Sequence, residues 1–121
     1  MNRIELPQAE FEVMEIIWKC PPPVTTVQIM AFLTDKNWKM PTLISLINRL
    51  ITRGFVKSEK SGRERLYYPL IHEEEYMRNE VKSIIQKYNK PSVTGLISAL
   101  YSDEKISNAE KEELIEWLRS K

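Results

Sequence analysis

The sequence has 121 residues, 42% of them hydrophobic, so it can bury one modest core, or a small core plus a helical extension that needs a partner. Its 18 basic and 17 acidic residues give a net charge of +1, which taken alone argues against a nucleic-acid partner. The single cysteine, Cys20, excludes an intramolecular disulfide and a cysteine-based zinc site. No segment reaches the roughly 20 apolar residues that span a bilayer, so we expect a cytoplasmic protein.

Two amphipathic helices are predicted before residue 38. In residues 9–18 the apolar side chains recur every three or four positions, which is helical spacing. The glutamates between them are expected to form an acidic outer face: Glu10, Glu12 and Glu15. After three prolines, Thr25 and Gln28 form a capping-box pattern that opens a second helix, which we expect to close at Asn37.

A third helix and a hairpin follow directly. The helix should begin at Met40 or Pro41 and end at Arg53, with Gly54 as its C-cap. Two short strand-like runs, 55–59 and 65–70, are joined by residues 60–64, where Gly62 supplies the positive φ of a tight turn. Three helices followed by a hairpin are the layout of a winged helix-turn-helix.

Positive charge gathers in the third helix and the hairpin. From Lys36 to Arg65, eight basic residues face two acidic ones, so double-stranded DNA would meet its most positive surface here. Thr42, Ser45 and Arg49 share one helix face, and the guanidinium of Arg49 could bond guanine O6 and N7 together. Basic hairpin residues would lie against phosphates. The predicted DNA-binding residues are Lys39, Pro41, Thr42, Ser45, Arg49, Arg53, Lys60, Arg63 and Arg65.

The second half of the chain is predicted to be helical, near 73–89, 92–100 and 108–119. Its apolar stripes either complete a single core or pair with the same helices of a second chain. We favour a homodimer, because the stripe from Tyr76 to Tyr88 continues past the winged unit. The predicted dimerisation residues are Tyr76, Val81, Ile84, Ile85, Tyr88, Leu96, Leu100, Leu114 and Leu118.

The fold class is therefore expected to be α+β. A winged helix-turn-helix N-terminal domain, residues 1–71, precedes an all-helical C-terminal dimerisation region, residues 72–121. The sequence has few residues suited to catalysis. His72 is the only histidine, and the three glycines form no glycine-rich phosphate loop. We expect no enzyme activity, cofactor or metal. The alternative to a DNA-binding protein is a winged-helix module that binds another protein, which would show little salt dependence on DNA.

Five blocks of this sequence resemble one known family. They are residues 9–18 (AEFEVMEIIW), Trp38, residues 49–56 (RLITRGFV), the pair Gly62-Arg63, and Tyr67 with Pro69. In order and spacing they are similar to the penicillinase and methicillin-resistance repressors, and the likeness covers nearly the whole chain. The family often has Trp-Ser-Pro-Lys-Thr where this chain has Trp38-Lys39-Met40-Pro41-Thr42, so we expect a different operator sequence.

The resemblance implies a homodimeric transcriptional repressor that binds dyad-symmetric operators of β-lactam-resistance genes. It also implies a regulatory protease, because some members are inactivated by a cut in the dimerisation region. The corresponding bond here is Ala99-Leu100, where antibiotic-resistance repressors have Asn-Phe. A copper-sensing branch of the family uses C-terminal cysteine pairs, which this chain does not have.

Overall fold

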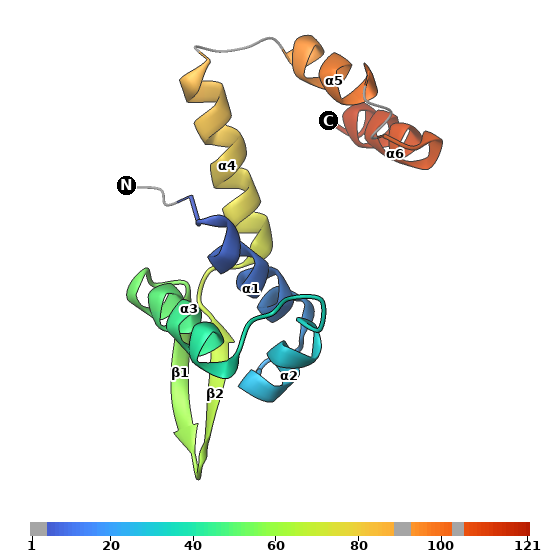
Figure 1. The fold of residues 1–121 in the computed structure, drawn as a ribbon. Coiled ribbons are helices and arrows are strands. Elements are labelled where there is room, and N and C mark those ends of the chain that lie inside the picture. Colours follow the sequence, from blue (N-terminus) through green and yellow to red (C-terminus); the bar gives the residue numbers. More distant parts are fainter. Residues whose placement is uncertain (1–4, 89–92, 103–105) are drawn as a thin grey trace. The chain divides into compact units, whose positions relative to one another are not determined.

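The computed structural model describes residues 5–88, 93–102 and 106–121. Its elements in chain order (Figure 1) are α1 (Gln8–Lys19), α2 (Thr26–Ala31), α3 (Met40–Thr52), β1 (Val56–Ser61), β2 (Glu64–Pro69), α4 (Glu73–Lys87), α5 (Val93–Ser102) and α6 (Asn108–Arg119). The chain divides into two compact units, Met1–Val81 and Lys82–Lys121, and the division falls within α4.

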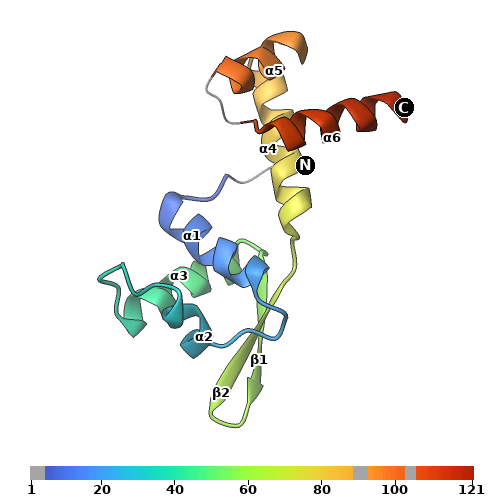
Figure 2. The same cartoon turned by 90° about the vertical axis from the view of Figure 1, so that its right-hand side faces the viewer.

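The N-terminal unit is built around a core between its first three helices. Val13, Met14 and Ile17 of α1 are fully buried, as are Leu43, Ile47 and Leu50 of α3. In both helices these residues recur at three- and four-residue spacing, which places them on one face. The antiparallel β1–β2 hairpin, here called the wing, projects beyond these helices in both views (Figure 2). The predicted winged helix-turn-helix is confirmed.

The end of α3 sets the direction of the wing. Gly54 adopts a φ of +83°, the left-handed conformation that glycine takes at low cost. The Gly54 N–H donates to the Ile51 carbonyl at 3.0 Å and the Phe55 N–H to the Leu50 carbonyl at 2.9 Å, the two hydrogen bonds of a Schellman motif. Because Leu50 and Phe55 are both buried, the turn also joins the core. α3 therefore ends at Thr52 with Arg53 as its C-cap, one residue earlier than the sequence predicts, and the chain turns directly into β1.

The wing has longer strands and a shorter loop than the sequence suggests. Ser61 pairs with Glu64, so only Gly62 and Arg63 form the loop, and residues 60, 61 and 64 belong to the strands. Gly62 has a φ of +64°, the sign that a two-residue hairpin loop requires at its first position. The base of the wing is tied to the helices through Val24, which exchanges two backbone hydrogen bonds with Tyr67, at 2.9 and 2.8 Å.

Two other expectations for the N-terminal unit are wrong. The second helix ends at Ala31 and does not reach Asn37, because the N–H groups of Phe32 and Leu33 bond carbonyls three residues back and tighten the last turn. Glu10 is not on an acidic outer face. Its side chain is 1% exposed and paired with Arg53.

Helix α4 contributes to the core of the N-terminal unit at its first turn. The side chain of Tyr76 is 8% exposed and packs against Phe11, Trp18 and Phe55, with ring centroids 5.7–5.8 Å away. Its hydroxyl accepts a hydrogen bond from the Leu6 N–H at 2.9 Å. The assignment of Tyr76 to the dimerisation stripe is therefore corrected, since this side chain is used within its own chain.

The C-terminal unit contains the end of α4 together with α5 and α6. Helix α6 opens with a capping box in which Ser107 and Glu110 each bond the other's backbone N–H. Its bounds are the predicted ones. Across residues 5–88, 93–102 and 106–121, none of the helices combines the length and apolar character needed to cross a bilayer.

Candidate nucleic-acid interface

The outward face of α3 has a shallow hollow of about 760 Å³, lined by polar side chains together with the apolar Pro41 and Ile44. Pro41, Ser45 and Arg49, all predicted from the sequence, line this hollow and are exposed. Asn48 also lines it and was missed by the sequence analysis, although it lies three residues after Ser45 on the same face. An asparagine amide can bond adenine N6 and N7 together, as arginine bonds guanine. The face thus offers two side chains able to read bases.

The first turn of α3 carries the remaining predicted residues of that helix. Lys39 occupies the N-cap position and makes no side-chain capping bond, and Pro41 stands within the first turn, where proline is favoured. Lys39 and Thr42 are exposed. The N-terminal end of a helix is its positive end, so Lys39 adds to a potential that already favours phosphate.

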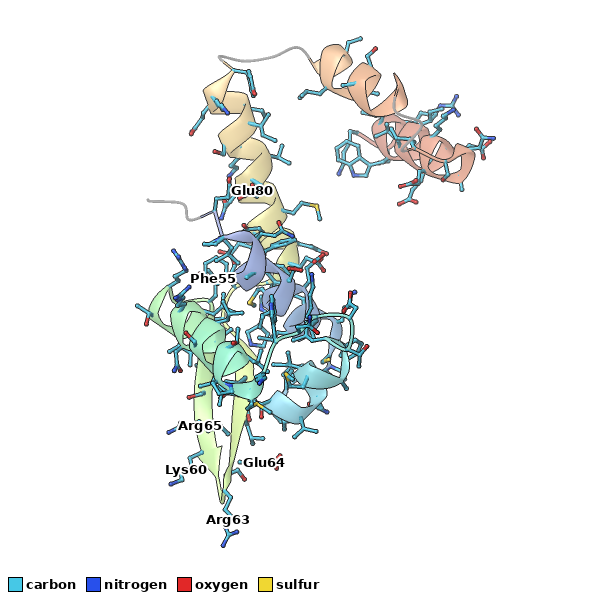
Figure 3. All side chains as sticks on the ribbon, in the orientation of Figure 1. Phe55, Lys60, Arg63, Glu64, Arg65 and Glu80 are labelled. Carbon is cyan, nitrogen blue, oxygen red and sulfur yellow. The ribbon has the colours of Figure 1, made fainter. Side chains whose placement is uncertain are left out.

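The wing presents its basic residues near the tip. Figure 3 shows Arg63 at the tip, with Lys60 and Arg65 beside it on the two strands. Lys60 and Arg65 are directly opposite each other in the register, so their side chains share one face of the hairpin. Like charges in this position destabilise a hairpin. A bound polyanion would relieve this repulsion.

A groove of about 630 Å³ separates α3 from the wing. Ile44 and Asn48 line it from α3, while Arg63 and Arg65 line it from the wing. The Arg65 guanidinium also donates to the Ser58 hydroxyl at 3.3 Å, which orients the arginine along the strand. The structure therefore places polar side chains of α3 and two arginines of the wing, together with Glu64, around one groove.

Two basic residues of the same segment are engaged by carboxylates of α1. Arg53 Nε donates to Glu10 Oε1 at 2.6 Å, and the arginine side chain is 32% exposed. Although Arg53 borders the hollow on α3, its charge holds α3 to α1. Lys36 Nζ is 2.7 Å from Glu12, and this hydrogen bond raises the pKa of the lysine. Arg53 looks like a DNA contact in the sequence because its acidic partner, Glu10, is 43 residues away.

The predicted dimerisation residues are distributed differently. Val81, Ile84 and Ile85 of α4, Tyr88 directly after it and Leu118 of α6 are exposed, whereas Leu96 and Leu114 are half-buried. The side chain of Leu100 lies outside the described residues. Three further apolar side chains are at least 47% exposed and were not predicted: Met77, Ile115 and Trp117. Exposed apolar rows of this kind, here on α4 and α6, are typical of surfaces that contact another molecule.

The chain is similar to known repressors over nearly its whole length. The penicillinase repressor family model matches residues 6–120. The methicillin resistance regulatory protein MecI of Staphylococcus aureus (strain N315) is 32% identical over 117 residues, which are 97% of this chain and 95% of that protein. The penicillinase repressor of Bacillus licheniformis is 26% identical over 94% of this chain and 89% of its own length.

Two solved structures match the N-terminal part. The DNA-binding domain of the repressor BlaI, determined in solution, aligns with a TM-score of 0.53 and 33% identity, covering 63% of this chain and 94% of that one. The monomeric form of Bacillus licheniformis BlaI, solved in complex with the blaP half-operator, aligns with a TM-score of 0.51 and 32% identity, covering 62% and 92% of the two chains.

Proposed function

Because the chain belongs to the penicillinase repressor family, we propose that it is a homodimeric transcriptional repressor that binds a dyad-symmetric DNA operator in the cytoplasm. The observation that carries this proposal is the groove between α3 and the wing, where Asn48 faces Arg63 and Arg65. Arg49 lies beside it on the outer face of α3. A helix with base-reading side chains and a basic wing can enter a major groove and contact the adjacent backbone together.

The dimer is supported by the unpartnered apolar surface. Ile84 and Ile85 on α4 and Tyr88 directly after it are 39–61% exposed, and Trp117 and Leu118 are 56% and 53% exposed on α6. Two copies that cover these surfaces would hold two recognition helices at a fixed separation. A dyad operator then gains from simultaneous engagement of both half-sites. Cleavage by a regulatory protease at Ala99-Leu100 stays a prediction from the resemblance.

The roles of the α3 and wing residues are expected to differ. Arg49→Ala should relax the preference at a G·C pair and Asn48→Ala at an A·T pair, each by a factor that corresponds to about 1–3 kcal/mol. Arg63→Ala in the wing should weaken binding to all sequences about equally, because phosphate contacts carry little sequence information. Lys19→Ala is the matched control, since Lys19 is exposed at the end of α1 and does not line either hollow beside α3.

The experiment is a fluorescence-anisotropy titration with a labelled duplex from upstream of the gene that encodes this chain, beside a scrambled duplex. If a dimer neutralises roughly 6–10 phosphates, the affinity should fall about 10³–10⁵-fold between ~50 and ~200 mM salt. A flat salt response would favour the winged-helix module that binds protein. Equal affinity for both duplexes would overturn sequence-specific binding. A monomer in sedimentation at micromolar concentration would overturn the dimer.

A further inference from the structure

Another hollow of the N-terminal unit lies away from α3 and the wing. It encloses about 320 Å³ between the start of the chain, α1 and the first two turns of α4. This volume is at the lower end of the range for small-molecule sites. Its apolar lining includes Phe11, Trp18, Tyr76 and Met77. We call it the α1–α4 pocket.

The aromatic side chains of the α1–α4 pocket are held in place by one another and by the backbone. The centroid of the Trp18 ring is 6.2 Å from that of Phe11 and 5.7 Å from that of Tyr76. The Trp18 Nε1–H donates to the Ile71 carbonyl at 2.9 Å, and the Leu6 N–H donates to the Tyr76 hydroxyl. A ligand would therefore meet rings whose positions are already fixed, which lowers the entropy cost of binding.

The charges of the α1–α4 pocket all have one sign. Glu5, Glu73 and Glu80 line it, the last from α4 (Figure 3), and no lysine or arginine is among its lining residues. The pKa of Tyr76 is raised, first by burial and then by the carboxylates of Glu80 and Glu5, against the opposing effect of the Leu6 N–H. The two carboxylates therefore act on the Tyr76 ring itself, which lines the pocket.

We propose that the α1–α4 pocket is a binding site for an organic cation that carries an aromatic group. Aromatic faces attract an ammonium group through their quadrupole, and carboxylates add a longer-range attraction. The carboxylates repel an anion. A neutral apolar ligand would gain nothing from their charge and should bind more weakly than a cation of the same shape. The inference does not depend on DNA binding, because the pocket shares no lining residue with the groove between α3 and the wing.

Tyr76 connects the α1–α4 pocket to the segment that joins α3 to the wing. The centroid of the Tyr76 ring is 5.7 Å from that of Phe55, which directly follows the Schellman turn of α3. A ligand that packs on Tyr76 would also bridge α1 and α4, the helix on which the exposed apolar row continues. A ligand bound in the pocket can therefore affect the positions of α3, which faces DNA, and of α4, which is proposed to dimerise.

The test is an NMR titration of the full chain, without DNA, with benzyltrimethylammonium as the probe. The indole N–H signal of Trp18 should shift, with half-saturation at about millimolar probe, as expected for a ligand of this size. The signals of Trp38 and Trp117 in the same spectrum serve as internal references, because neither residue lines the pocket. Benzyldimethylamine N-oxide, which has nearly the same shape and no net charge, should bind more weakly.

Two variants distinguish specific binding in the pocket from a general attraction of the probe to an acidic surface. Glu80→Gln should weaken the probe about two- to fivefold, the usual size of one partly exposed ionic contact. Glu75→Gln is the matched control, since Glu75 lies on the same helix and does not line the pocket. Equal weakening by both variants, or equal binding of the N-oxide, would overturn the proposal. So would a Trp18 shift that disappears as protein concentration rises, because a second copy would then be the occupant.

Discussion

Replacing Arg53 by alanine should lower the free energy of unfolding without removing a DNA contact. The carboxylate of Glu10 is 1% exposed, and the Arg53 guanidinium holds it through contacts of 2.6 and 3.5 Å. Without the arginine, a charged group would remain buried and unpaired between α1 and α3. Arg49→Ala on the adjacent turn should remove a DNA contact and leave the free energy of unfolding nearly unchanged, because Arg49 is exposed and no core residue depends on it.

The size of the loss follows from the burial of the two partners. Removing one member of a fully buried ion pair costs about 3–5 kcal/mol. Arg53 is 32% exposed, so water can partly replace its guanidinium, and we expect about 2–3 kcal/mol for Arg53→Ala. Glu10→Ala leaves the arginine free to reach water and should cost less, about 1–2 kcal/mol. The double variant Glu10→Met/Arg53→Met should recover much of the loss, because an apolar pair leaves no buried charge.

Urea denaturation followed by circular dichroism measures these free energies of unfolding, and anisotropy at low urea measures the DNA affinity of the folded fraction. The expected order of stability is wild type and Arg49→Ala, then Glu10→Ala, then Arg53→Ala. The reasoning is refuted if Arg53→Ala is as stable as the wild type. It is also refuted if folded Arg53→Ala loses as much affinity for the operator as Arg49→Ala.

Two further variants test other parts of the N-terminal unit. The raised pKa of Tyr76 means that the neutral phenol is favoured on folding, so stability should be constant below the ordinary pKa of 10.0 and fall as pH rises above it. Tyr76→Phe should cost about 1 kcal/mol at neutral pH through the lost Leu6 hydrogen bond and should flatten that alkaline fall, as measured by urea denaturation across pH. Gly62→Ala should strain the wing by about 1–2 kcal/mol, because its φ of +64° is left-handed, while open space surrounds the added methyl. It should weaken DNA binding with little change in the melting of the helices, whereas Ser61→Ala should leave both unchanged.

Local signals in the sequence predict most of the helix and strand order. Gly54 marks the end of α3, Thr25 and Gln28 mark the start of α2, and α6 has its predicted bounds. Each of these signals acts within a few residues, through a cap or a turn that the backbone must form there. The position of the wing turn at Gly62 is also predicted, but its length is not, since the loop has two residues where the sequence suggested residues 60–64.

The errors about individual side chains arise where a side chain finds its partner far along the chain. Glu10 looks like a surface residue beside Glu12, and only the fold brings it to Arg53, which is 43 residues away. Tyr76 fits the apolar stripe of α4, yet its hydroxyl meets the backbone of Leu6, 70 residues earlier. Helical periodicity identifies which residues share a face, but it does not say which neighbour that face contacts.

The two uses of α4 lead to a prediction about where the chain can be cut. A chain that ends at Leu70 has all of β2 but lacks Tyr76, whose ring fills the space between Phe11, Trp18 and Phe55. Losing a buried aromatic side chain costs about 3–5 kcal/mol, which is most of the stability of a small domain. A chain that ends at Tyr88 keeps that contact and should fold.

Thermal unfolding followed by circular dichroism compares the two truncated chains. The chain ending at Tyr88 should show a cooperative transition, and the one ending at Leu70 should melt at a much lower temperature or without cooperativity. Tyr76→Ala in the longer chain is the control and should reproduce the loss. If the chain ending at Leu70 melts as the longer one does, Tyr76 is dispensable to the core, and α4 then serves only the region beyond the winged unit.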